Sequence, residues 1–212
     1  MVTKVKYDEV VIGGGFYGTV IATRLMRQSP HRRVLLLEAG DALLSRASSR
    51  NQARIHTGYH YPRSLVTAHR SRVNSARFSE EWADATVADQ VMLYAIGRFS
   101  SKTNANQFRR FATVVGAPLV AAEDRFRRMF DKRLVEEVYQ VKEPVFDAIK
   151  LAEWARLELA RVGVEVRLRR RVTSVEKLGS GQLKVLFGGD GESPGPEEWV
   201  TANTVYNCTY SG

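Results

Sequence analysis

The chain has 212 residues, of which 44% are hydrophobic and 26% are charged, and its formal net charge is +9 at pH 7. This composition is that of a globular protein with one sizeable core or two small ones, and it excludes disordered and fibrous proteins. A single cysteine, Cys208, excludes an internal disulfide framework and favours a reducing, cytoplasmic environment.

Targeting and surface charge exclude further classes. No apolar run approaches the roughly 20 residues of a membrane span, and the N-terminus passes from Lys4 and Lys6 directly into an apolar strand. We therefore expect neither a membrane span nor a signal peptide. Arginines cluster at 125–128 and 167–171, where they alternate with apolar residues, and no zinc spacing or RNP-type sequence accompanies them. This pattern predicts a solvated face and no nucleic-acid partner.

The first predicted element is an apolar strand, residues 7–12, which runs directly into Gly-x-Gly-x-x-Gly and then into a helix over 16–27. Gly13 allows a tight turn, Gly15 lets a pyrophosphate approach the backbone, and Gly18 lets the helix lie close to the strand. The amides and the dipole of the helix N-terminus favour phosphate groups. The segment therefore predicts a dinucleotide site.

The second strand supports this interpretation over a glycine-rich turn without a ligand. It covers residues 34–37 and is followed by Glu38, twenty residues after Gly18. A carboxylate at this position hydrogen-bonds a ribose diol in dinucleotide-binding folds. A polar loop over 45–52 then follows, at the place where a simple nicotinamide-binding protein would begin its next helix.

Since this loop has few apolar side chains to bury, a long cofactor that lies across it would order it.

The remaining elements alternate between helix and strand. We expect helices over 65–82, 104–115 and 147–162, and strands over 91–97, 135–141, 164–168, 172–175, 183–187, 198–200 and 204–207. The first of these helices begins after the turn at 62–64, and Gly116 and Gly163 follow the other two as C-caps. Residues 183–187 and 198–200 form a hairpin around the loop 188–196.

The order of these parts resembles the D-amino-acid-oxidase-type (DAO) family of FAD-dependent oxidoreductases. The resemblance rests on the glycine motif, Glu38-Ala39-Gly40, the polar loop, a Gly-x-Glu-x-Arg type strand after a helix, and a closing V-x-N-x-T strand. Residues 51–61, NQARIHTGYHY, are similar to the N-S-G-V-I-H-A-G-x-Y-Y segment of the L-2-hydroxyglutarate oxidase branch.

The resemblance implies an α/β fold, in which a Rossmann-like FAD/NAD(P)-binding domain has a central parallel sheet and a β-meander crossover. It places the two parts of this domain at 1–82 and 144–212, and part of a second, β-rich substrate domain at 83–143. In this family the chain continues with the rest of the substrate sheet and a glycine-rich segment over the flavin. We therefore expect a fragment, a truncated product or one subunit of a split pair, with a second chain or C-terminal half as its partner.

The cofactor implied by the resemblance is FAD, and no metal site is expected. The residues implied to contact FAD are Gly13, Gly14, Gly15, Phe16, Tyr17, Gly18, Glu38, Ala39, Arg46, Ser48, Ser49, Asn51, Gln52, Val172, Asn207, Cys208 and Thr209. By this resemblance Glu38 holds the adenosine ribose and Val172 reaches the adenine through its backbone. Loop capping or solvent contact stays the alternative for Arg46, Ser49 and Asn51.

The implied activity is oxidation of a small amine or 2-hydroxy acid, with hydride transfer to N5 of the flavin. An alcohol substrate needs a base, and His56 and His60 are the candidates because an imidazole titrates near working pH. Tyr59 and Arg63 are candidates for holding a substrate carboxylate. The alternatives are a packed loop histidine for His56 and a packed helix start for the other two.

Two other functions stay open from the sequence. One is an NAD(P)-dependent dehydrogenase, against which the polar loop at 45–52 argues. The other is a non-catalytic FAD-binding half or subunit of a split oxidoreductase, which the early end of the chain favours. Cys208 is expected to be a small buried residue at a strand end, since no second cysteine or neighbouring histidine indicates redox or nucleophilic use.

Overall fold

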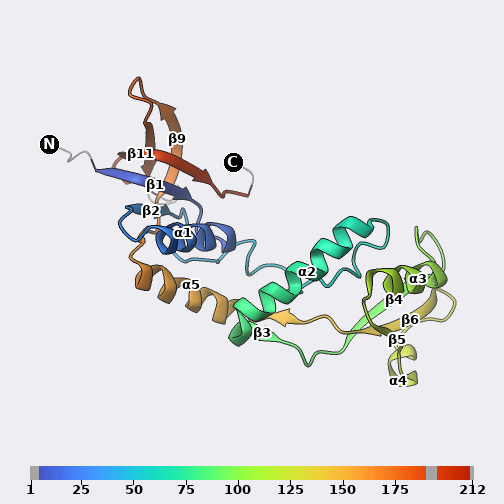
Figure 1. Ribbon diagram of the computed structural model, residues 1–212. Coiled ribbons are helices and arrows are strands. Elements are labelled where there is room, and N and C mark those ends of the chain that lie inside the picture. The colour runs from blue at the N-terminus through green and yellow to red at the C-terminus, as the bar shows by residue number, and fades with distance from the viewer. Residues whose placement is uncertain (1–4, 190–194, 211–212) are drawn as a thin grey trace. The chain divides into compact units, whose positions relative to one another are not determined.

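The computed structural model describes residues 5–189 and 195–210 (Figure 1). The chain folds into two compact units, Met1–Asn51 with Ala148–Gly212, and Gln52–Asp147. Residues 190–194 of the predicted hairpin loop and the chain end at 211–212 lie outside the described residues. The units divide the chain at other places than the predicted boundaries, because residues 52–82 group with the middle of the chain.

The first unit is built on a six-stranded sheet with the order β8-β2-β1-β11-β10-β9. Its strands are β1 (Lys6–Ile12), β2 (Val34–Leu37), β8 (Glu165–Arg167), β9 (Arg171–Lys177), β10 (Leu183–Gly188) and β11 (Glu198–Asn207). The strands β8, β2, β1 and β11 pair in parallel, whereas β9, β10 and β11 form an antiparallel meander. The predicted Rossmann-like class, with a parallel sheet and a β-meander, is confirmed.

The end of the chain differs from the prediction in one respect. The segments predicted as separate strands at 198–200 and 204–207 form one continuous strand, β11. Its first part pairs antiparallel with β10 through Glu198–Ala202, and its later part pairs parallel with β1 through Thr201–Asn207. A strand with partners on both edges stays extended through the polar residues that interrupt its apolar pattern.

Helices cover one face of this sheet. Figure 1 shows α1 (Phe16–Gln28) and α5 (Ala148–Val162) beside each other, and they contribute Leu25 and Leu159 to a cluster with Val11 and Leu36. On the other face, Val10 and Leu35 pack with Phe187 and Val200 of the meander. Successive strand residues point to opposite faces, so neighbours in one strand serve two cores.

A buried carboxylate joins the two helices. Glu158 of α5 accepts hydrogen bonds from Arg161 at 2.7 and 2.8 Å and from Arg27 of α1 at 2.7 and 3.0 Å. The bonds from Arg161, followed by those from Arg27, hold the pKa of Glu158 at about 2, although burial of the carboxylate opposes this. The carboxylate is therefore ionised throughout the neutral and mildly acidic range.

We expect this pair of contacts to make stability pH-dependent. The pKa of Glu158 is lower in the folded chain than the ordinary value of 4.5, so its contribution is present above pH 4.5 and is lost as the pH falls toward about 2. Because both arginines are substantially exposed, we expect the free energy of unfolding to fall by only about 1 kcal/mol when Glu158 is protonated. Urea unfolding at pH 7 and pH 3 should show a smaller pH difference for Glu158→Gln than for Glu153→Gln, an exposed control on the same helix. Equal pH differences for both variants would contradict this expectation.

The second unit contains two small sheets and short helices. The strands β4 (Met92–Gly97), β6 (Val135–Val141) and β5 (Leu119–Ala121) form an antiparallel sheet in the order β4-β6-β5, and β3 (Thr86–Val87) pairs with β7 (Val145–Phe146). The helices are α2 (Leu65–Glu81), the 3₁₀ turn η1 (Ala83–Ala85), α3 (Ala105–Val115) and α4 (Asp124–Arg127). The prediction missed β3, β5, β7, η1 and α4, which are too short to show a hydrophobic period.

Local sequence signals set the ends of the longer helices. Ser64 caps α2 by accepting from the amide of Thr67, and Asn104 and Gln107 form a capping box at the start of α3. Gly116 ends α3 in the left-handed conformation, with φ 71°, as the prediction required. None of the described helices is long and apolar enough to cross a bilayer.

The core of the second unit explains why residues 52–82 belong to it. Tyr59 and Ala68 pack in one cluster with Phe108 of α3 and Tyr139 of β6. In addition, the amide of Ile55 donates to the Pro144 carbonyl at 2.9 Å, and the Phe146 amide donates to the Ala53 carbonyl at 2.8 Å. The first part of the 52–82 segment is thus tied to the middle of the chain by long-range contacts that its sequence pattern does not predict.

Candidate functional site

The glycine turn between β1 and α1 is held by close backbone contacts. Gly13 has φ 105°, and a Cβ there would lie 2.9 Å from the carbonyl oxygen of Cys208, directly after β11. A Cβ on Gly18 would lie 1.9 Å from the carbonyl oxygen of Gly13. Only glycine fits at these two positions, because any side chain would collide with the backbone. Their roles are therefore to bring α1 and the residues after β11 against the turn.

Gly15 differs from its two neighbours in the motif. Its φ of −73° suits any residue, and a Cβ there would meet only Ser48 Oγ, at 3.4 Å. Gly15 is the N-cap of α1 and provides no side-chain cap, while the Phe16 amide donates to Ser48 Oγ at 3.0 Å. The missing side chain leaves space directly in front of the helix N-terminus, where a phosphate group is favoured. These residues fit a dinucleotide pyrophosphate.

Glu38 lies buried beside this turn. One carboxylate oxygen, Oε2, accepts from the Gly14 amide at 2.5 Å, and Oε1 accepts from the Gly40 amide at 2.6 Å. The carboxylate thus links the glycine turn to the residues that follow β2, through the Gly40 amide. Each oxygen keeps a further lone pair, so Glu38 can still accept from ribose hydroxyls. Its role as ribose ligand stays a prediction.

The polar loop after Glu38 closes on itself by local hydrogen bonds. Ser49 Oγ donates to the Arg46 carbonyl at 3.2 Å, and Asn51 Nδ2 donates to the Ala47 carbonyl at 2.9 Å. The loop-capping alternative therefore describes Ser49 and Asn51 in this state. Arg46, Gln52 and Tyr17 are exposed. Within the loop, Ser48 is in direct contact with the glycine motif, through the Phe16 amide.

The residues after β11 lie next to the glycine turn. The Cys208 amide donates to the Ile12 carbonyl at 2.8 Å, and Asn207 Oδ1 accepts from the amide and the hydroxyl of Thr209 at 3.0 and 2.6 Å. Burial raises the pKa of the Cys208 thiol, which suits a packing role. The structure therefore places the predicted 207–209 segment at the same edge of the sheet as the glycines.

Val172 is connected to this edge through the preceding residues. The amides of Arg169 and Arg170 donate to the carbonyls of Gly40 and Glu38, each at 2.9 Å. Val172 lies two residues further, where it pairs with Phe187 and packs against the core on the meander side of the sheet. Its backbone contact with adenine stays a prediction.

A second polar cluster lies within the other unit, around Glu143. The Glu143 side chain is fully buried, and it forms an ion pair with Arg54. The Tyr94 hydroxyl donates to Glu143 Oε2 at 3.2 Å, and the Thr57 amide donates to Oε1 at 3.0 Å. The Arg54 guanidinium also lies over the Tyr94 ring, 4.9 Å from its centroid. These contacts hold the buried carboxylate in one position.

One of the predicted base candidates, His56, lies against this carboxylate, and the other, His60, stacks on His56. His56 Nδ1 is buried, lies 3.5 Å from Glu143 Oε1, and has no hydrogen-bond partner of normal length. The His56 ring stacks on that of His60, with centroids 4.9 Å apart. A small shift would let His56 Nδ1 donate to Glu143, which would leave Nε2 as the proton acceptor. The structure thus brings both histidines together beside a buried carboxylate.

The two residues predicted to hold a substrate carboxylate, Tyr59 and Arg63, differ in burial. Tyr59 is buried, its hydroxyl donates to the Pro118 carbonyl, and burial raises its pKa to about 12. Its ring therefore serves the core, which is the alternative that the sequence left open. Arg63 is exposed in the turn before α2. Substrate binding by either residue stays a prediction.

Sequence reasoning missed Glu143, Arg54 and Tyr94 as members of a polar cluster. Arg54 and Tyr94 are 40 residues apart, and Glu143 lies at the end of an apolar strand pattern, directly before Pro144. An acid at the end of a buried strand was the one available signal. For the chain segments that the structure describes, no group of three or more His, Cys, Asp or Glu side chains could hold a metal ion.

Known proteins share this organisation. The family model of FAD-dependent oxidoreductases (DAO) matches residues 8–210. The FAD-dependent monooxygenase FPY4 of Fusarium mangiferae is 30% identical over 181 residues, which are 85% of this chain and 46% of that protein. The mitochondrial L-2-hydroxyglutarate dehydrogenase of Caenorhabditis elegans is 39% identical over 56 residues, covering 26% of this chain and 13% of that protein.

Solved structures agree on the fold. The FAD-bound L-α-glycerophosphate oxidase of Mycoplasma pneumoniae superposes with a TM-score of 0.68 at 15% identity, over 95% of this chain and 53% of that one. The chain thus spans about half the length of the proteins that it matches along most of its own length. The cofactor of the matched family is FAD, which disfavours the nicotinamide alternative. The glycine turn, the sheet order and the family match together show that the chain belongs to the DAO family of FAD-dependent oxidoreductases.

Proposed function

We propose that this chain provides the FAD-binding part of an oxidoreductase that oxidises a small 2-hydroxy acid or amine. The observation that carries the proposal is the α1 N-terminus at Gly15, where a side chain would meet only Ser48 Oγ, at 3.4 Å. The name of one similar protein, an L-2-hydroxyglutarate dehydrogenase, supports a 2-hydroxy acid substrate.

The chain's own residues would hold the cofactor at the edge of the first sheet. The backbone at Gly15 and the amides at the start of α1 would bind the pyrophosphate, with Ser48 beside them. Glu38 would accept from the adenosine ribose, and Arg46, Gln52 and the 207–209 segment would contact the remainder. Bound FAD supplies a hydride acceptor at its N5.

The second unit would handle the substrate proton. For a 2-hydroxy acid, His56 would take the hydroxyl proton at Nε2 while Glu143 Oε1 accepts from Nδ1–H, which keeps the ring oriented and stabilises its protonated form. An amine substrate would need only to bind in its deprotonated form. The prepared His56–Glu143 pair therefore favours the hydroxy acid.

A spectroscopic experiment tests the proposed function. We expect the purified chain to bind added FAD weakly in a titration followed by flavin fluorescence, and 2-hydroxy acids added without oxygen to bleach the bound FAD faster than the matching amino acids. Retention of FAD without bleaching by either class would favour the non-catalytic alternative. Binding of NAD in titration calorimetry, with no flavin retained, would overturn the proposal. If bleaching occurs, ¹⁸O₂ distinguishes an oxidase from a monooxygenase, because only a monooxygenase places labelled oxygen in the organic product.

A further inference from the structure

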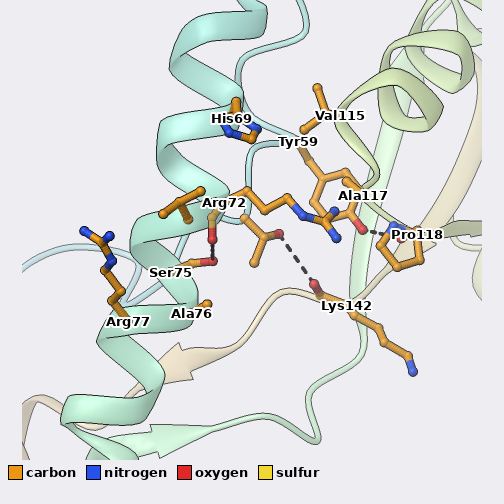
Figure 2. Close-up of a pocket in the computed structure, with 12 residues that line it drawn as sticks. Tyr59, His69, Arg72, Ser75, Ala76, Arg77, Val115, Ala117, Pro118 and Lys142 are labelled. Atoms are coloured by element: carbon orange, nitrogen blue, oxygen red, sulfur yellow. Dashed lines mark hydrogen bonds between the residues drawn. The ribbon is translucent and has the colours of Figure 1, made fainter.

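A cavity of about 610 Å³ opens within the second unit, between α2 and the turn that follows α3 (Figure 2). This volume lies in the range of small-molecule sites. Apolar wall comes from Val73, Val115 and Pro118. His56, His60 and Glu143 are not among its lining residues, so the cavity does not contain the proposed proton acceptor.

Arg72 is the charged group at the centre of this cavity. Figure 2 shows its side chain extending from α2 toward Tyr59, Ala117 and Pro118, whereas the charged ends of Arg77 and Lys142 point away. The guanidinium lies against Gly116, since a Cβ built there would be 3.8 to 3.9 Å from its carbon and nitrogens. The Arg72 side chain is half-buried and held beside backbone.

The positive charge of Arg72 has no counterpart in the cavity wall. The lining contains no Asp or Glu, and along residues 5–189 and 195–210 the Arg72 guanidinium forms neither an ion pair nor a hydrogen bond. The nearby carboxylate, Glu143, is already paired with Arg54. His69 lines the cavity from the preceding turn of α2 and can donate a second hydrogen bond. A half-buried guanidinium without a protein partner is free to bind an anion that enters the cavity.

We propose that this Arg72 cavity binds a small organic carboxylate. The planar guanidinium offers paired N–H donors that match a carboxylate, and the apolar wall contacts the hydrocarbon part of the ligand. The site goes beyond the proposed oxidation, because it contains neither the glycine turn nor the His56–Glu143 pair.

The test uses 4-methylpentanoate as the probe and its matching alcohol, 4-methylpentan-1-ol, as the neutral control. We expect the changes in the ¹⁵N NMR amide shifts at 69–76 and 115–117 to saturate as the acid is added, and the alcohol to bind at least about tenfold more weakly. Arg72→Gln should lower the affinity for 4-methylpentanoate by a similar factor. Arg70→Gln removes the same charge from an exposed position of α2 outside the cavity, and it should leave the affinity unchanged.

A second variant separates a local site from general attraction to a basic protein. Ala76→Trp fills the cavity from the next turn of α2 without changing the charge. It should also lower the affinity for 4-methylpentanoate. Equal weakening by Arg70→Gln and Arg72→Gln, or unchanged binding in Ala76→Trp with its amide spectrum otherwise preserved, would overturn the proposal. Inorganic phosphate that competes as well as the acid would overturn the assignment to a carboxylate. These outcomes do not depend on FAD, so they leave the proposed function to its own test.

Discussion

Replacement of Gly15 by valine is expected to abolish FAD binding while the protein still folds. The backbone at Gly15 suits a β-branched residue, and the new Cβ would meet only Ser48 Oγ, at 3.4 Å. The valine methyl groups would, however, occupy the space before the α1 amides that a pyrophosphate needs. We expect FAD to bind at least about 100-fold more weakly, which corresponds to losing one or two charge-assisted hydrogen bonds. Titration of the chain with FAD, followed by flavin fluorescence, measures the change.

Two glycine variants serve as controls for this experiment. Gly15→Ala should lower the affinity for FAD less than Gly15→Val does, because the single methyl group of alanine occupies less of the space. Gly18→Ala should instead destabilise the fold by about 3 kcal/mol or more, because its Cβ would lie 1.9 Å from the Gly13 carbonyl oxygen. Retention of FAD by Gly15→Val at the wild-type level would show that the pyrophosphate does not bind at this turn.

Replacement of Glu143 by alanine is expected to destabilise the second unit by about 3 to 5 kcal/mol. The fully buried carboxylate pairs with Arg54 and accepts from the Tyr94 hydroxyl and the Thr57 amide. Its removal leaves the Arg54 charge in a low-dielectric site without a partner, which costs more than the pair itself contributes. Hydrogen exchange of the α3 and β6 amides reports on this unit directly.

The matched control is Glu123→Ala, which breaks an exposed ion pair with Arg125. It should change the free energy of opening measured by hydrogen exchange by less than about 0.5 kcal/mol. Adding Arg54→Met to Glu143→Leu should recover much of the lost stability, because it removes both buried charges together. If Glu143→Ala were no more destabilising than Glu123→Ala, the buried network would not hold this unit together. Loss of substrate bleaching in the Arg54→Met/Glu143→Leu variant, with FAD still bound, would then separate the orienting role of Glu143 from its structural one.

Sequence alone determined the parts of this protein that depend on neighbouring residues. The strand, turn and helix around Gly13, Gly15 and Gly18 follow from backbone freedom and apolar spacing within one short segment. The caps at Ser64, Asn104 and Gly116 are likewise local, which is why the longer helices begin and end close to their predicted positions.

Only the tertiary structure decided the features that depend on distant residues. β11 is one strand because β1 and β10 pair with its two ends, and residues 52–82 join the second unit because Tyr59 and Ala68 pack against α3. The Glu143 cluster joins positions up to 89 residues apart, and each member alone has an ordinary sequence context. Helix and strand propensity and hydrophobic periodicity can be read from a local stretch of sequence. Burial and charge pairing depend on residues far apart in the sequence, which come into contact only in the folded chain.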